Sequence, residues 1–354
     1  MNVDVDQRPL LLLPAPTPGE TPERSLPDPR TARSRRARRL MQFGAAALIA
    51  ASFALDRSVW LALAFLFVIV VPFEKLFPRH RGQRIRRPGV GTDVAHGLAA
   101  PVLATASLAV AVVVGVASLA WLPGLLLRPV VEMLPAALLP FVGIMLFDLA
   151  TYWVHRWSHE VPLLWRFHAV HHSTEHLDWV SGFRNHPFDG AILAPPFVLL
   201  MAAGFDAQFT GILAVIQIAS GLFLHANVRW RLRPLHRIVI TPEFHHWHHT
   251  NERAAHHSNY SVFLPLWDTL FGTYFMPSDR RPQVYGIDEP MPLTLVGQLR
   301  QPFVGTGPIR SLAWRALRHP VTTTRELARH VRAVLGDIWR STTRPTRRTE
   351  LFGE

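Results

Sequence analysis

Cysteine is absent from the 354 residues, which excludes disulfide bonds, Cys-ligated zinc, cysteine-held iron–sulfur clusters and thiol nucleophiles. Charged residues are scarce at 18%, whereas hydrophobic residues make up 49%, and this balance argues against a disordered chain and an ordinary soluble enzyme. The 25 acidic residues face 37 basic ones, of which only Lys75 is a lysine, and the formal charge is +12. Histidine, in contrast, is unusually frequent, with 19 residues.

Runs of apolar residues occur in three pairs. The longest run, 97–127, carries no charge and is long enough to span a bilayer as a helix. The other five runs are Met41–Leu55, Val59–Phe73, Pro129–Phe147, Gly190–Phe205 and Phe209–Leu224. The shorter runs are short for a bilayer core of about 30 Å, so the first and third pairs are predicted as shallow hairpins or as spans that locally thin the membrane, with buried core helices as the alternative. The sequence therefore predicts an all-α integral membrane protein of helical hairpins.

Arginine-rich stretches flank these runs, and basic flanks stay on the cytoplasmic side of a membrane. Three hairpins return the chain to one side each time, so both termini and the histidine-rich segments are predicted to be cytoplasmic. We expect a disordered basic tail over 1–40, transmembrane hairpins over 41–141, and a basic C-terminal tail over 277–354 with an amphipathic helix at 321–342. The N-terminal tail lacks interleaved aromatic residues, so no nucleic-acid partner is predicted.

Three clusters of histidine have helical spacing. Residues three or four positions apart share one face of a helix, with Cβ atoms about 5–6 Å apart. The clusters are His155 and His159, then His168, His171 and His172, then His245, His248 and His249. Neutral imidazole binds iron, zinc, copper and nickel near pH 7. Eight such ligands exceed the four of one tetrahedral zinc ion, so the sequence predicts a site for two metal ions.

Each cluster follows an apolar run. The run 129–147 is predicted to continue as one helix through His155, which places Asp148 near the face that carries the first cluster. The third cluster follows Thr241 and Pro242, a signal for the start of a helix. Helices that leave the bilayer at these points would hold the metals between the cytosol and the acyl chains.

The clusters, in this order and with apolar hairpins between them, resemble the histidine boxes of the fatty acid hydroxylase/sterol desaturase superfamily. The resemblance covers 142–276, the predicted catalytic domain, and includes the motifs Arg184-Asn-His186-Pro187, His225-Ala-Asn227, Asn259-Tyr260 and Trp267-Asp268. Members of this superfamily are integral-membrane diiron oxygenases. The resemblance thus implies two iron ions with O2 as co-substrate. It implies that the eight clustered histidines, His186 and His225 are metal ligands, and that Asp148 orients a ligand imidazole.

The resemblance also implies a function, the hydroxylation of a C–H bond in a lipid substrate that is fatty acyl, sterol or related. No catalytic side chain beyond the metal ligands is predicted. Because the chain has no cysteine-held cluster and no cytochrome-type His-Pro-Gly-Gly segment, a separate electron donor of reductase, ferredoxin or cytochrome type is implied. A sterol-type lipid desaturase is the alternative enzyme. A non-catalytic metal-binding or transport protein of the membrane is the alternative from another class.

Overall fold

The computed structural model describes residues 32–55, 58–192, 194–305 and 320–343. These residues form helices joined by loops, with two isolated β-bridges and no strand among them. The chain divides into two compact units, residues 1–40 and residues 41–354, and all the histidine clusters belong to the second. Most of the predicted N-terminal tail lies outside the described residues; from Ala32 the chain is helical, as part of α1 (Ala32–Leu55).

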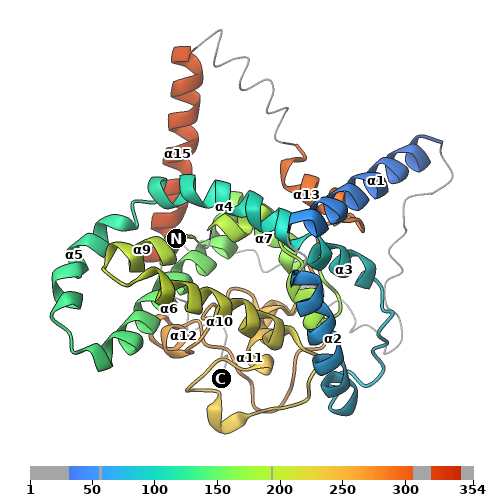
Figure 1. The fold of residues 1–354 in the computed structure, drawn as a ribbon, viewed down its shortest axis with the longest axis horizontal. Coiled ribbons are helices and arrows are strands. Elements are labelled where there is room, and N and C mark those ends of the chain that lie inside the picture. The colour runs from blue at the N-terminus through green and yellow to red at the C-terminus, as the bar shows by residue number, and fades with distance from the viewer. Residues whose placement is uncertain (1–31, 56–57, 193, 306–319, 344–354) are drawn as a thin grey trace, which may run out of the picture. The chain divides into compact units, whose positions relative to one another are not determined.

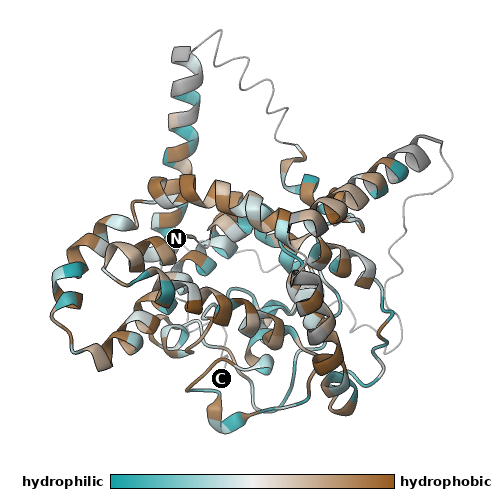
Figure 2. Ribbon diagram, viewed as in Figure 1, coloured by the Kyte–Doolittle hydropathy of each residue, from teal (hydrophilic) through white to brown (hydrophobic). Residues whose placement is uncertain are grey.

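Among the described residues of the second unit, three helical stretches are long and apolar enough to cross a membrane. They are α4 (Ala100–Ala117), α10 (Ala207–His225), and the stretch formed by η1 (Ala136–Leu138) and α6 (Leu139–Glu160). Only 11% of the α4 window and 22% of the α10 window are buried, so most of their side chains are at least partly exposed. Figure 2 shows that both helices are largely apolar. Apolar side chains on all sides of a helix suit a lipid environment. The predicted all-α fold with membrane-length apolar helices is confirmed.

The second predicted hairpin is built differently from our expectation. The run 97–127 is not one helix, because α4 ends at Ala117 and α5 (Trp121–Glu132) follows a turn in which Leu119 has a left-handed φ of 57°. Arg128, which separates the predicted runs 97–127 and 129–147, lies inside α5, where its guanidinium donates to Glu132 at 2.8 Å. The chain turns instead between α5 and η1. An uncharged run carries no signal for where a helix ends, so hydropathy alone did not place this turn.

Several pairs of helices in the second unit pack closely against each other (Figure 1). α5 packs on α9 (Ala194–Ala202), α4 packs on α8 (Pro187–Ile192), and α6 packs on both α9 and α7 (Pro162–His172). A Cβ at Gly124 would lie 2.6 Å from α9, and a Cβ at Gly143 would lie 2.5 Å from an aromatic ring of α10. These glycines therefore let α5 approach α9 and α6 approach α10.

The remaining helices complete the second unit. α11 and η2 pack on α10, α12 and α15 pack on α6, and α3 packs on η2. Their bounds are α2 (Ser58–Leu76), α3 (Val90–Leu98), η2 (Trp179–Phe183), η3 (Arg233–Leu235), α11 (Pro242–His248), η4 (Arg253–Ala255), α12 (Leu266–Phe271), α13 (Leu295–Arg300), η5 (Gln301–Phe303) and α15 (Pro320–Thr343). The helix expected at 321–342 corresponds to α15, while 306–319 and 344–354 lie outside the described residues.

Candidate metal centre

The three histidine clusters lie on three helices. α6 carries His155 and His159 in its last two turns, α7 ends in the second cluster, and α11 carries the third. The start of α11 is fixed by Thr241, whose hydroxyl accepts the N–H of Phe244 at 3.4 Å, and by Pro242 at the first helical position. These two residues fix where α11 begins, and therefore in which direction each of its histidines points.

The structure gathers nine of the ten histidines predicted as ligands into two groups. In each group the ligand nitrogens all lie within 4.8 Å of one another. The first group consists of His155, His159, His168, His172 and His248, and the second of His171, His225, His245 and His249. The groups adjoin, because the rings of His172 and His249 are stacked with centroids 4.2 Å apart. Two ions bound in them would therefore be neighbours.

The division between the groups follows helix geometry. Residues i and i+4 of a helix differ by about 40° in direction, whereas residue i+3 lies about 60° to the other side of residue i. In α7, His168 and His172 face the first group while His171 faces the second. In α11, His245 and residue 249, its C-cap, face the second group while His248 faces the first. Each of these clusters therefore contributes to both groups.

Distances between ring nitrogens suit metal ligands. His168 Nε2 and His172 Nε2 are 3.1 Å apart, and His245 Nε2 is 3.0 Å from His249 Nε2 and 3.3 Å from His225 Nε2. Metal–nitrogen bonds of about 2.1 Å place two ligands about 3.0 Å apart at right angles and about 4.2 Å apart across the ion. The residues present therefore fit a bound ion in each group.

Backbone carbonyls hold the outer ring nitrogens of the first group. His155 Nδ1–H donates to the carbonyl of Tyr260 at 2.7 Å, and His248 Nδ1–H donates to the carbonyl of Ser258 at 3.0 Å. Because a carbonyl only accepts, these rings keep the lone pair on Nε2. His248 Nε2 and His159 Nε2 are buried without a hydrogen-bond partner. A buried acceptor without a partner costs free energy, which an ion bound at this point would recover.

The second group is held in the same way. His171 Nδ1–H donates to the carbonyl of Arg184 at 3.1 Å, and His225 Nδ1–H donates to the carbonyl of Gly221 at 2.6 Å. Arg184 is itself fixed by a buried ion pair with Asp93, with 2.5 Å between its Nε and the carboxylate. The backbone that orients the histidines is therefore tied to the rest of the fold.

Burial keeps these imidazoles neutral, the form in which they bind metals. Removal from water lowers the pKa of His171, His172, His245, His248 and His249 well below the usual value, and the neighbouring imidazoles lower it further. A site built this way takes up cations and resists protons at neutral pH.

Asp189 is a site residue that the sequence analysis missed. Its carboxylate oxygens lie 3.0 and 3.1 Å from His168 Nδ1, and both side chains are buried. A carboxylate that accepts the outer N–H of a ligand imidazole fixes the ring and raises its basicity. No spacing rule connects Asp189 on α8 with His168 on α7, so only the packing of these helices reveals the pair.

We predict that Asp189→Asn weakens metal binding in the first group by about 10- to 100-fold, because the amide lacks the charge that makes His168 a stronger ligand. Metal retention against a chelator series measures the effect. Asp206→Asn is the matched control, since Asp206 caps α10 through the N–H of Phe209 and asparagine caps equally well. Equal chelator midpoints for the two variants would contradict the role of Asp189.

Asp148 does not orient an imidazole. Its carboxylate accepts the backbone N–H of Val262 (3.3 Å), Phe263 (2.9 Å) and Leu264 (2.9 Å). Seven residues separate Asp148 from His155 along α6, a rise of about 10 Å, which is too far for a carboxylate to span. Asp148 and His155 lie near the same face of α6, but the distance between them along the helix axis is too large for a contact. Asp148 instead anchors the loop that follows Tyr260.

His186 lies in neither group. Its Nε2 is 3.1 Å from the carbonyl of Leu299, and its Nδ1 accepts the N–H of Phe188 at 3.1 Å. Both ring nitrogens are thus occupied by the backbone, and no lone pair remains for a metal. His186 is the last residue before α8, which begins at Pro187. Its ring contacts the backbone of Leu299 and Phe188 and lies outside both histidine groups.

The motif residues after the third cluster hold the carbonyls that orient the ligands. Asp268 is fully buried and accepts the N–H of Tyr260 at 2.8 Å. Asn259 has a left-handed φ of 62°, accepts the N–H of Phe275 at 2.8 Å and donates to the carbonyl of the same residue at 2.8 Å. These bonds fix the backbone on both sides of Asn259, and with it the carbonyls of Ser258 and Tyr260.

Comparison with known proteins adds independent evidence. Residues 140–273, which contain the clusters on α6, α7 and α11 together with His225, match the family model described as fatty acid hydroxylase. No solved structure shows significant similarity to the chain.

Several curated proteins are similar. The ornithine lipid hydroxylase OlsE of Rhizobium tropici is 30% identical over 260 residues, which cover 70% of this chain and 77% of that protein. An alkylglycerol monooxygenase of Danio rerio is 31% identical over 156 residues, 43% of this chain and 33% of that protein. The very-long-chain aldehyde decarbonylase GL1-6 of Oryza sativa subsp. indica is 31% identical over 144 residues, 36% of this chain and 21% of that protein.

Proposed function

Since the chain belongs to the fatty acid hydroxylase family, we propose that it is a membrane-bound diiron oxygenase that hydroxylates a C–H bond of a lipid with O2 and external electrons. Membership in this family confirms the resemblance noted in the sequence. With three membrane-length apolar helices, the chain is a membrane protein.

The observation that carries the proposal is the pair of adjoining histidine groups at the ends of apolar helices. Two ions held there would supply the activation of O2, for which no side chain has the chemistry. The nine imidazoles hold the ions, the backbone carbonyls and Asp189 orient the rings, and burial excludes water from the centre. The reaction takes up two electrons and two protons and releases the second oxygen atom of O2 as water; beyond the metal ligands we assign no catalytic side chain.

A groove between α6 and α10 offers a place for the hydrocarbon chain of the substrate. Its volume is about 310 Å3, and its walls are apolar except for Ser220. Ile144 comes from α6, Leu213 and Ile216 from α10, and the loop anchored by Asp148 closes it through residues 262–264. Both α6 and α10 carry histidines of the two groups at their C-terminal ends. A hydrocarbon chain in this groove would therefore extend from the interior of the bilayer toward these histidines.

We expect Ile216→Trp to fill this groove and to reduce lipid oxidation by at least about tenfold, since an indole displaces the chain from the path to the metals. Ile216 is 44% exposed, so the larger side chain does not overpack a core. Bound metal stays unchanged in this variant. Ile218→Trp is the matched control, because Ile218 lies on the same helix, is 64% exposed and does not line the groove. Loss of activity in both variants, or in neither, would contradict the assignment.

The proposal also includes the orientation of the chain in the membrane, the source of its electrons and the lipid substrate. The histidine groups and both termini lie on the cytoplasmic side, where the basic segments remain. Because the chain has no cysteine for an iron–sulfur cluster, electrons come from a separate reductase, ferredoxin or cytochrome-type protein. OlsE covers most of this chain, so ornithine lipid is the first substrate to test.

The test is lipid profiling in a host without this activity, grown under 18O2, with the active chain and with His248→Ala. A lipid that gains one labelled oxygen only with the active chain supports the hydroxylase. A lipid that loses two hydrogens without label identifies the desaturase instead. Unchanged lipids together with altered cellular metal content would favour the metal-binding or transport alternative.

A further inference from the structure

A second cavity lies apart from the groove at α6 and α10. It has a volume of about 290 Å3 and is enclosed by α2, α3, η2 and the loop before α3. The wall made by η2 separates it from the second histidine group, because a Cβ at Gly182 would lie 3.3 Å from His225 Nδ1 on the far side. A ligand in this cavity therefore does not reach the metals, and the cavity is distinct from the catalytic site.

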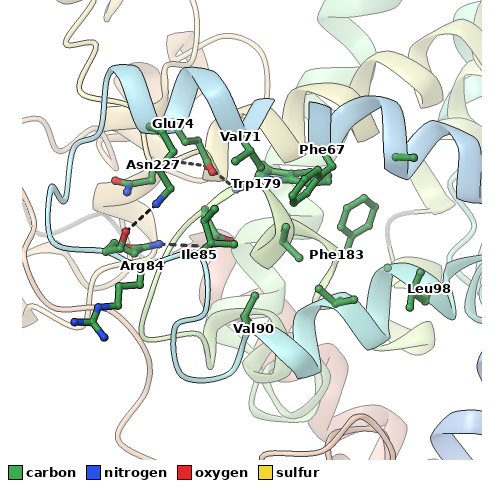
Figure 3. Close-up of a pocket in the computed structure, with 17 residues that line it drawn as sticks. Phe67, Val71, Glu74, Arg84, Ile85, Val90, Leu98, Trp179, Phe183 and Asn227 are labelled. Atoms are coloured by element: carbon green, nitrogen blue, oxygen red, sulfur yellow. Dashed lines mark hydrogen bonds between the residues drawn. The ribbon is translucent and has the colours of Figure 1, made fainter. Parts of the chain in front are cut away.

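The cavity is amphipathic along its length (Figure 3). Phe67, Phe183 and Leu98 lie toward one end, where α3 leads into the apolar helix α4. Arg84 and Asn227 lie at the opposite end. An apolar end beside a membrane-length helix and a polar end away from it match the two halves of a bilayer lipid.

The polar end carries an excess of positive charge. Lys75, the only lysine of the chain, donates to the carbonyl of Gln83 at 3.0 Å and keeps two further N–H donors. Arg84 is exposed and has no ion-pair partner among the described residues. Cations at the rim of an apolar cavity attract the headgroups of anionic lipids.

The two carboxylates of the cavity wall are already engaged. Asp178 is paired with the buried guanidinium of Arg87, with 2.5 Å between Nε and Oδ2. Glu74 is buried and accepts the backbone N–H of Trp179 and of Asn227, each at 2.9 Å. Lys75 and Arg84 therefore remain to balance a negative ligand.

From this arrangement we infer that the cavity is a binding site for an anionic phospholipid of the surrounding bilayer, with one acyl chain toward Leu98 and the phosphate between Lys75 and Arg84. The site is independent of the proposed oxygenase activity. A lipid held there braces η2, whose other side packs against the helix that carries His225.

The single lysine makes a direct test possible. The delipidated full-length chain is reductively methylated with 13C, which keeps the positive charge, and the Lys75 signal is followed by NMR. We expect short-chain phosphatidylglycerol to shift this signal with at least tenfold higher affinity than phosphatidylcholine. Equal affinity for the two lipids, or a shift of the same size with inorganic phosphate alone, would overturn the inference.

Variants locate the lipid within the cavity. Arg84→Gln is expected to weaken phosphatidylglycerol binding about tenfold, whereas Arg86→Gln, an exposed arginine of the same loop outside the cavity, leaves it unchanged. Val94→Trp fills the apolar part and removes binding; Val94 is 42% exposed, so the fold tolerates the change. Equal effects of the two arginine variants, or full binding by Val94→Trp, would refute the site whatever the outcome for lipid oxidation.

Discussion

Replacing His248 or His171 with alanine is expected to abolish lipid oxidation and to remove metal from the protein. His248 belongs to the first histidine group and His171 to the second, so each variant leaves one group short of a ligand. A pair of ions bound in the two groups would supply the O2 chemistry together, and therefore each single loss is expected to reduce hydroxylation to background. Metal content by mass spectrometry and labelled lipid product measure the two effects.

The controls for this experiment come from other histidines of the chain. His256→Ala removes an exposed imidazole close to the third cluster, and His186→Ala removes a buried imidazole that lies outside both groups. Both variants are expected to keep their metal. Membrane insertion and monodisperse extraction exclude misfolding of His171→Ala and His248→Ala. Unchanged oxidation in those two variants would end the oxygenase proposal, and metal loss in His186→Ala would restore that residue as a ligand.

Acidification is expected to release the metals and to destabilise the protein as the pH falls below about 6.5. In an unfolded chain histidines titrate near pH 6.5, whereas burial holds the folded pKa of His171, His172, His245, His248 and His249 well below that. Below pH 6.5 the unfolded state binds protons that the folded state does not. The free energy of unfolding is therefore expected to decrease as the pH decreases below that value.

The metals add to this dependence, because each ligand must be deprotonated to bind. We expect bound metal to be complete at pH 7.5 and to decline between pH 6.5 and 5, together with the thermal midpoint in detergent. The His256→Ala variant is the control and should give the same profile, since His256 lies outside both histidine groups. Full metal content and an unchanged midpoint at pH 5 would show that the buried imidazoles do not hold the ions.

The sequence by itself determined the chemistry of the centre. The spacing of His155 and His159, and of the clusters on α7 and α11, follows from helix periodicity alone. Long uncharged runs similarly predicted helices of membrane length, because few soluble folds accommodate them. Both features depend on residues close together in the chain, where geometry is fixed by the regular helix.

Tertiary structure decided which histidines lie together in each group. Helices α6, α7 and α11 meet so that His248 joins His155 and His168, while His171 joins His225, and no local pattern sets the angles at which separate helices cross. The same reason explains why the contact of Asp189 with His168 was missed, and why Asp148 and His186 lie against backbone groups outside the two histidine groups. The position of a residue on a helix gives the direction of its side chain. Which group that side chain contacts depends on how segments distant in the sequence pack together.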